Sequence, residues 1–494
     1  MIKKPQLKKI AALLLSVQML AAAPLAAQPA GIPSMGAAGG AELSPNLERT
    51  LGDAIMEQGR RDPQYISDVI VTQYLTQLGE QLAKHSSVPV NYDVTVFALR
   101  DRSINAFALP GGYIGIHTGL IAEAESESEL ASVLAHEIAH VSLRHVARGM
   151  TQGSQSNHLM IASLVGALLA GLAGSADLAM GVATFGQAAA VDRQLGFSRQ
   201  AEQEADRVGY QMLQGAGFDT AGMAQMFKRL QNKSRLNESP NSYATTHPLS
   251  AQRLSDAENR AYSNSNTQFT NNDDFLFVQA AVMVLQAQGG AALESVQQRL
   301  QSFAHSRTGV GQAAAYYGLA YAAQKRRDIS ATTNYLQKAL EVGVPAAALD
   351  VLQVEVSWSQ NQNAQALQQA QAAWKKWPQN QAVALALVEA FNKQNQTAQA
   401  IPLLEQLVNK WPNEPRFYQL LAQGLERIGQ PIAAREAMAQ YYILVGALPS
   451  AVDQLQQARD QSTDFYQQST LDVQIRDLRE RLERDRLLLE RFKS

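Results

Sequence analysis

The 494-residue chain contains no cysteine, which excludes disulfide bonds and a lipid anchor attached through cysteine. The chain also lacks a large net charge of either sign, because its 42 Lys and Arg residues nearly balance its 44 Asp and Glu residues, for a net charge of −2. No basic cluster persists beyond the N-terminal segment, so the chain lacks the electrostatic footprint of a nucleic-acid-binding protein. The length is sufficient for at least two domains.

The N-terminal segment has the pattern of a cleavable secretory signal peptide. Four lysines lie within the first nine residues, an apolar stretch follows at residues 10–23, and small residues precede Gln28. We therefore expect residues 1–27 to be removed, residues 28–43 to form a flexible leader, and the mature protein to reach the periplasm. Exported proteins without disulfides are common there, so stability must come from the packed core and any bound metal.

The most informative motif is HEIAH at residues 136–140, within a run of helical periodicity at residues 130–146. Residues i and i+4 of an α-helix lie about 40° apart, so His136 and His140 share one face and can bind one zinc ion. Glu137 then flanks the metal and is placed to act as a general base. The alternative is a helix with two ordinary histidines.

A third ligand is expected from SRQAEQEAD at residues 198–206, which also reads as a helix. Glu202 and Asp206 share a face at i, i+4 spacing, whereas Glu204 is turned about 200° from Glu202. Glu202 is therefore the predicted third ligand, and Asp206 the acceptor that orients a ligand histidine. A solvated acidic helix face is the alternative interpretation.

Upstream, NAFALPGGYIGI at residues 105–116 predicts a strand, a turn and a second strand. Together with the two helical motifs, it resembles the M48 metallopeptidases over residues 47–254. The resemblance implies one Zn²⁺ per chain, held by His136, His140 and Glu202, with Glu137 as general base. It also implies a zincin-like peptidase domain, to which we assign residues 44–268.

Three other histidines require interpretation. On a continuous helix His145 would lie about 140° from His140, so it is predicted to be structural or exposed rather than a ligand. His117, at the end of the second strand, is predicted to be structural. His247 follows a polar loop in a segment that also resembles the family, and it is a candidate gate on the metal or oxyanion stabiliser, with Arg253 as a weaker candidate. Ordinary surface exposure is the alternative for His247.

Residues 159–191 form two apolar stretches separated by Asp177. The first is long enough to span a bilayer, but it lies between residues that must meet at one ion. We expect an apolar hairpin or lid over the active site, with contact to a membrane surface as the alternative.

From residue 273 to 494 the chain is rich in Ala, Gln and Leu and carries an internal repeat. Trp377-Pro378 recurs as Trp411-Pro412, and the intervening apolar positions recur with the same period of about 34 residues, as in tetratricopeptide repeats. Stacked helix pairs of this kind form a groove that holds a peptide or partner protein. The apolar stripe of residues 471–489 is predicted to cap the array, with a partner-binding helix as the alternative.

The sequence thus predicts an α+β, mainly α protein, in which a zincin-like peptidase domain precedes an all-α tetratricopeptide-repeat solenoid. The combination resembles a family of periplasmic proteases that act in outer-membrane protein quality control. This implies unfolded or misassembled outer-membrane proteins as clients and the β-barrel assembly machinery as a partner. The strand at residues 113–116 is predicted to offer its edge to an extended substrate. The alternative is a mainly non-catalytic chaperone with a tightly gated zinc site.

Overall fold

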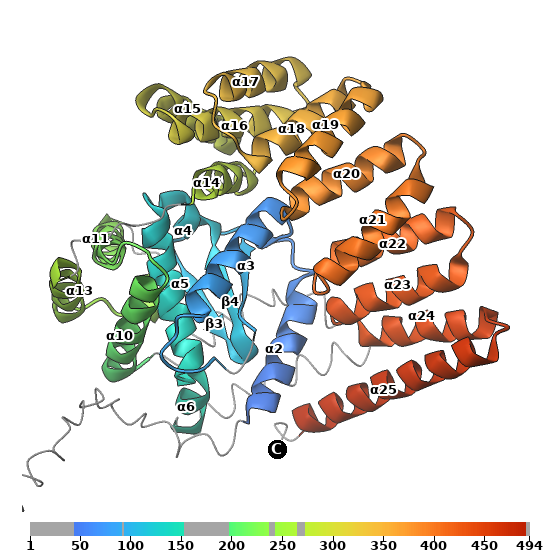
Figure 1. Ribbon diagram of the computed structural model, residues 1–494. Helices are drawn as coiled ribbons and strands as arrows, with labels where there is room; N and C mark the ends of the chain where they lie inside the picture. The colour runs from blue at the N-terminus through green and yellow to red at the C-terminus, as the bar shows by residue number, and fades with distance from the viewer. Residues whose placement is uncertain (1–43, 91–92, 153–196, 237–242, 264–271, 491–494) are drawn as a thin grey trace, which may run out of the picture. The chain divides into compact units, whose positions relative to one another are not determined.

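The computed structural model describes residues 44–90, 93–152, 197–236, 243–263 and 272–490 (Figure 1). The predicted signal peptide, the leader and the apolar segment 159–191 lie outside these residues. Within the described part of the chain, no helix is both long and apolar enough to cross a membrane.

The N-terminal half combines helices with one small sheet. Its elements are α2 (Pro45–Gly59), β1 (Tyr65–Ile66), α3 (Val69–Ala83), β2 (Thr95–Leu99), β3 (Ala106–Leu109), the 3₁₀ turn η1 (Pro110–Gly112), β4 (Tyr113–His117), α4 (Thr118–Glu123), α5 (Glu127–Ser142), α6 (His145–Gln152), α10 (Arg199–Gly215), α11 (Ala221–Leu236), α12 (Tyr243–Thr246) and α13 (Ala251–Ser263).

The sheet has the strand order β1-β2-β4-β3, in which β2 and β4 are parallel and the other pairs antiparallel. The predicted strand–turn–strand is confirmed, and the turn uses Gly111 at a φ of 79°. The prediction that residues 113–116 offer a free edge is wrong, because β4 pairs with β2 on one side and β3 on the other. Within the described sheet, β3 is the terminal strand at that end.

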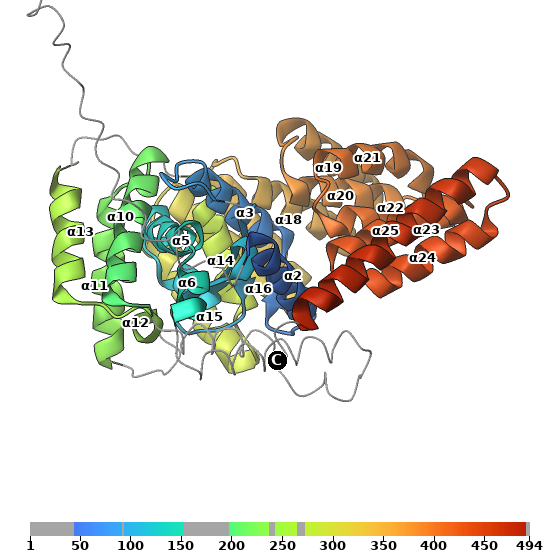
Figure 2. The ribbon, with the colours of Figure 1, turned by 90° about the horizontal axis from the view of Figure 1, so that it is seen from below.

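Helix α5, which carries the HEIAH motif, is buried along nearly its whole length. Ser126 caps its N-terminus by accepting a hydrogen bond from the Glu129 amide. Helix α10 packs directly on it, because a Cβ at Gly209 would lie 3.1 Å from the backbone of Ala135. Figure 2 shows α10 and α11 beside α5, with α13 on the far side of them. These neighbours fix the metal-binding face of α5 within a packed core.

The second half is entirely helical. Its elements are α14 (Asp274–Leu285), α15 (Gly290–Ser306), α16 (Val310–Lys325), α17 (Ile329–Glu341), α18 (Ala347–Ser359), α19 (Asn363–Lys376), α20 (Gln381–Lys393), α21 (Thr397–Lys410), α22 (Pro415–Arg427), α23 (Pro431–Leu444), α24 (Leu448–Gln461) and α25 (Phe465–Glu490) (Figure 1).

The structure reproduces the predicted 34-residue repeat as pairs of antiparallel helices. Trp377 and Trp411 end α19 and α21 in nearly the same backbone conformation, with φ of −126° in both and ψ of 59° and 69°. Ala400 and Leu404, at repeat packing positions, are buried between neighbouring helices. The repeated sequence therefore encodes a repeated backbone geometry as well as a repeated apolar pattern.

Helix α14 contributes to two apolar cores. Phe275, Val278 and Val282 pack into the core that surrounds α5, whereas Phe277 and Ala280 pack into the core of the first repeat helices. The assigned boundary between residues 268 and 273 therefore precedes a helix that belongs structurally to both halves.

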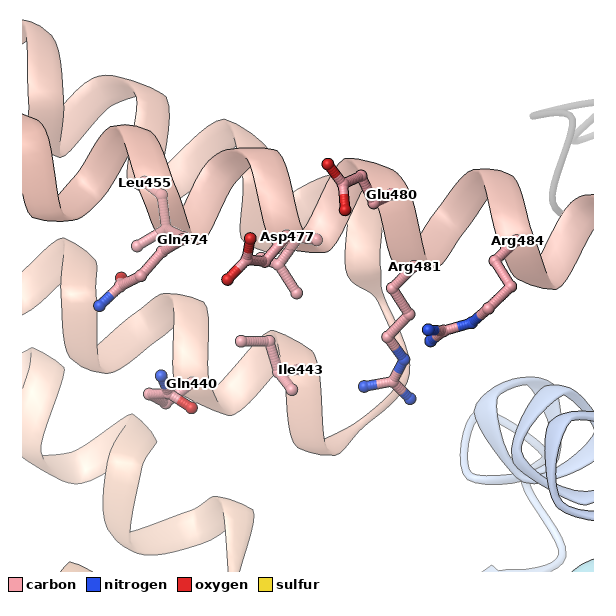
Figure 3. A pocket seen from close by; sticks show the side chains of 9 residues that line it. Gln440, Ile443, Leu455, Gln474, Asp477, Glu480, Arg481 and Arg484 are labelled. Atoms are coloured by element: carbon pink, nitrogen blue, oxygen red, sulfur yellow. The ribbon is translucent and has the colours of Figure 1, made fainter. Parts of the chain in front are cut away.

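The last helix, α25, closes the array. Leu471, Ile475 and Leu478 bury the predicted apolar stripe against α24. A groove of about 500 Å³ remains between α25 and the preceding helices (Figure 3). Its rim carries Asp477 and Glu480 and then Arg481 and Arg484, so the acidic pair and the basic pair follow one another along α25.

Side chains of α14 and α15 also contact the segment that leads into α5. The Gln279 amide on α14 donates to the carbonyls of Ile121 and Ala124, at 3.1 and 2.6 Å. Arg299 on α15 donates to the carbonyl of Ala122 and pairs with Glu123. The end of α4, immediately before α5, is therefore fixed from the repeat side.

Candidate metal centre

The two histidines of the HEIAH motif lie side by side, as their spacing predicts. The Nε2 atoms of His136 and His140 are 2.9 Å apart, and both side chains are at most 1% exposed. These nitrogens lie 3.4 and 3.6 Å from the two carboxylate oxygens of Glu202. The three predicted ligands therefore converge from α5 and α10.

Glu202 reaches this position from the first turn of α10. Ser198 caps the helix by accepting a hydrogen bond from the Ala201 amide. The helix N-terminus favours a carboxylate in its first turn. Burial raises the pKa of Glu202, but nearby His247 and His136 outweigh that effect and hold the pKa well below its usual range. Glu202 is therefore ionised, as a ligand must be.

His247 completes the group, although it comes from a separate segment after α12. Its Nδ1 lies 3.0 Å from Glu202 Oε1 and 3.4 Å from His136 Nε2, and the side chain is fully buried. The ring stacks on Tyr243, with centroids 4.4 Å apart, and on Phe197, with centroids 5.5 Å apart. The structure therefore places the buried His247 side chain beside the three predicted ligands, and the alternative of an exposed side chain does not hold.

The donor set fits a zinc ion. One ligand atom from each of His136, His140, Glu202 and His247 lies within 4.8 Å of the others, and all four residues are buried. Three imidazoles and one carboxylate are ligands that zinc prefers, in the number that a tetrahedral site requires. Both oxygens of fully buried Glu137 lack a hydrogen-bond partner among the described residues, although Oε1 lies 3.4 Å from His247 Nε2. A buried carboxylate without partners is costly unless a cation or reacting group lies beside it.

Asp206 and Arg253 support the ligands from behind. Asp206 Oδ1 lies 2.9 Å from His136 Nδ1, on the side of the ring opposite the ligand nitrogen. Arg253 donates through Nε and Nη2 to both oxygens of Asp206, and its Nη1 lies 2.6 Å from Glu202 Oε2. The same Nη1 donates to the carbonyl of Pro248, next to His247. This guanidinium therefore ties two carboxylates to the His247 segment, which favours a clamp over the predicted oxyanion role.

The carboxylates shape the charge of the ligand histidines. Burial lowers the pKa of His136, but Asp206 and Glu202 outweigh burial and raise it to about 9. Burial and the neighbouring His136 hold the pKa of His140 well below its usual range. Burial also lowers the pKa of His247, but Glu137 and Glu202 outweigh it and raise the pKa. The negative field that favours a proton on two of these rings also favours a divalent cation between them.

The sequence pattern did not identify every residue around the site. Helix α5 ends at Ser142, and Arg144 has a φ of 54°, so the chain turns back and places His145 Nδ1 3.0 Å from His140 Nδ1. His145 is buried, which excludes the exposed alternative, and it is absent from the four-residue ligand group. Tyr243 and Phe197 were also missed, because a residue in a four-residue helix or in a loop carries no spacing signal. His117 bonds to Ser103 in the sheet region, as expected of a structural residue.

Comparison with known proteins gives the same assignment. The profile of peptidase family M48 matches residues 70–261, and a tetratricopeptide repeat profile matches residues 357–424. The β-barrel assembly-enhancing protease of Escherichia coli is 32% identical over 97% of this chain and 98% of its own length. The chain belongs to peptidase family M48.

Two further relatives cover smaller shares. The putative β-barrel assembly-enhancing protease of Vibrio cholerae is 41% identical over 47% of this chain and 48% of its own length. The metalloprotease LoiP of Escherichia coli is 31% identical over 38% of this chain and 69% of its own length. This M48 protein is therefore a zinc metalloendopeptidase with a tetratricopeptide-repeat domain.

Proposed function

We propose that this M48 protein is a periplasmic endopeptidase that degrades unfolded or misassembled outer-membrane β-barrel proteins and assists their assembly through its repeats. The proposal is supported by the N-terminal export pattern and by the names of the relatives, two of which are called β-barrel assembly-enhancing proteases. The repeat domain supplies helix pairs of the kind that commonly hold a partner protein. On this proposal, the β-barrel assembly machinery is one such partner.

The proposed catalytic roles follow from the positions of the side chains. His136, His140 and Glu202 hold the metal. When bound, zinc polarises the scissile carbonyl and makes the attacking water more acidic. Glu137 accepts a proton from that water and later donates it to the leaving amine. Its two oxygens support this role, because neither accepts a hydrogen bond among the described residues, and the nearest approach is that of His247 Nε2 to Oε1 at 3.4 Å.

The observation that carries the mechanism is the closed position of His247. With its Nδ1 3.0 Å from Glu202 Oε1, this ring occupies the place that a fourth ligand would take. A catalytic site needs that position for water or substrate, so His247 must leave before catalysis. Resting activity then scales with the population of the displaced state.

Substrate would bind as an added strand. Residues 113–116, for which the sequence predicted this role, lie inside the sheet, whereas β3 is the terminal described strand. We therefore assign the substrate-pairing edge to β3, at residues 106–109. An unpaired strand of a misassembled β-barrel has the extended backbone that such pairing requires.

The test compares wild type, Glu137→Gln and His247→Ala on a urea-unfolded β-barrel precursor, with zinc content measured in parallel. Glu137→Gln should keep zinc and lose proteolysis. His247→Ala should keep zinc through the other three ligands and raise basal proteolysis. A loss of roughly 10²-fold would instead assign His247 to the oxyanion, and no change would remove it from the mechanism.

A second function is favoured by the complete burial of the ligand group. An enzyme whose four metal-facing side chains are all buried at rest could act mainly as a chaperone. In that case Glu137→Gln would prevent precursor aggregation as well as wild type, and wild type would degrade none of it. Degradation by wild type with equal aggregation protection by both proteins would assign both activities to the chain.

A further inference from the structure

His145 contacts the metal centre from behind, through a path that does not involve the metal-facing nitrogens. Its Nδ1 lies 3.0 Å from Nδ1 of His140, and the rings meet edge to face with centroids 4.9 Å apart. Its Nε2 lies 3.3 Å from Oε2 of Glu204, which also lies 3.4 Å from Arg148 Nη1. His145 is 3% exposed, so solvent does not satisfy its nitrogens.

The donor and acceptor roles along these contacts are determined by the metal-facing nitrogen of His140. Nε2 of His140 faces His136 and Glu202, so a metal there requires a bare Nε2 and a proton on Nδ1. Nδ1–H of His140 must then donate to Nδ1 of His145, because two bare or two protonated nitrogens cannot bond. The proton of His145 therefore sits on Nε2, where it donates to the Glu204 carboxylate. Each contact fixes the next.

The two ligand histidines of α5 are thus supported in parallel from α10. His136 Nδ1 contacts Asp206 directly, at 2.9 Å, whereas His140 reaches Glu204 through His145. This explains why α10 carries three acidic residues, at 202, 204 and 206, although only the first and third share a face. The reversal at Arg144 makes the second path available, since it carries the chain from the end of α5 into α6.

We propose that His145 and Glu204 are positioning residues that hold His140 in the tautomer and ring orientation needed to bind the metal. This inference rests on the proposed role of His140 as a ligand. Acceptors behind a ligand histidine raise its basicity and fix its orientation, and removing them typically lowers metal affinity 10–100-fold.

The experiment measures zinc affinity by chelator competition, the visible spectrum of the Co²⁺-substituted protein, and the melting temperature of the metal-free protein. His145→Phe keeps the ring volume but removes both nitrogens, whereas His145→Asn places an acceptor oxygen near the Nδ1 position. His117→Phe is the matched control, because His117 is another buried, hydrogen-bonded histidine and is not a member of the ligand group.

We expect His145→Phe to weaken zinc binding about 10–100-fold and to shift the Co²⁺ spectrum, with His145→Asn recovering most of the affinity. His117→Phe should lower the melting temperature of the metal-free protein and leave zinc affinity unchanged. Equal zinc affinities for His145→Phe and His117→Phe would overturn the inference, as would a His145→Asn protein no better than His145→Phe.

Glu204 keeps the test decisive if His145→Phe does not fold, because its partly exposed side chain tolerates replacement. Glu204→Ala should weaken zinc binding about tenfold, with recovery in Glu204→Gln, while Glu202→Ala should lose far more. Unchanged zinc affinity in Glu204→Ala would overturn this inference but leave the proposed ligand set standing. Full zinc retention in His140→Ala would instead overturn the proposed ligand set.

Discussion

Glu57 gives the protein a stability that depends on pH. This glutamate on α2 packs against the turn between α23 and α24, where a side chain at Gly446 would lie 2.7 Å from Glu57 Cβ. Next to it, Arg60 donates to the carbonyl of Leu444 at 2.7 Å. Burial raises the pKa of Glu57 from 4.5 to about 7, and Arg61, Arg481 and Arg60 only partly offset it. The charged form is therefore disfavoured in the folded state.

The sign of the effect follows from the raised pKa. Between pH 4.5 and about 7, the folded state holds the Glu57 proton while the unfolded state releases it. The stabilisation is fully present below pH 4.5 and is lost as pH rises through 7. The shift corresponds to about 3 kcal/mol. Glu57→Gln imitates the protonated form, so it should be more stable than wild type by up to about 3 kcal/mol at pH 8 and by under about 1 kcal/mol at pH 5.

Hydrogen exchange measured on the α2 peptides gives the local opening free energy, and calorimetry gives the melting temperature. Comparing variant with wild type at each pH removes the separate effect of acid on metal binding. Glu426→Gln, which removes the same charge from an exposed position on α22, is the control and should show no such pH dependence. An identical advantage for Glu57→Gln at pH 5 and pH 8 would refute the reasoning.

Three further outcomes are expected. His136→Ala, His140→Ala and Glu202→Ala should each lower the zinc content measured by atomic absorption, and retention of full zinc by Glu202→Ala alongside its loss in Glu204→Ala would contradict the third-ligand assignment. A chain ending at residue 272 should have a lower melting temperature than one ending after Leu285, because it loses Phe275, Val278 and Val282 from the core around α5. Burial of these three side chains contributes roughly 5–9 kcal/mol to the free energy of unfolding. Equal melting temperatures would exclude α14 from that core. The chain that ends after Leu285 should also degrade a full-length client more slowly than the intact enzyme, and equal rates of degradation would argue against the repeats as the docking surface.

Periodicity predicted the parts of this protein that depend on local spacing. The helices carrying His136, His140 and Glu202, the turn at Gly111, and the 34-residue repeat all follow from residue spacing in one segment of chain. The edge assignment for residues 113–116 failed, because strand order is set by pairing between distant segments. Gly115 reports only the pairing with β3, since a Cβ there would lie 2.4 Å from the Phe107 ring on that strand, and the pairing of β4 with β2 has no such local signal.

The boundary of α5 shows why the surroundings of the ligands were harder to predict than the ligands. Residues 130–146 contain no Pro or Gly, so their pattern predicted one continuous helix, and on that helix His145 points away from His140. The chain instead adopts a left-handed conformation at Arg144, whose guanidinium bonds to Glu48 on α2 at 2.8 Å. A non-glycine residue with positive φ costs on the order of 1 kcal/mol and persists where surrounding contacts determine it. Here the contact is made by Glu48, almost one hundred residues earlier in the chain, and it accompanies the turn at Arg144 that brings His145 to His140. The ligand spacing is thus local, whereas the second support of His140 depends on tertiary structure.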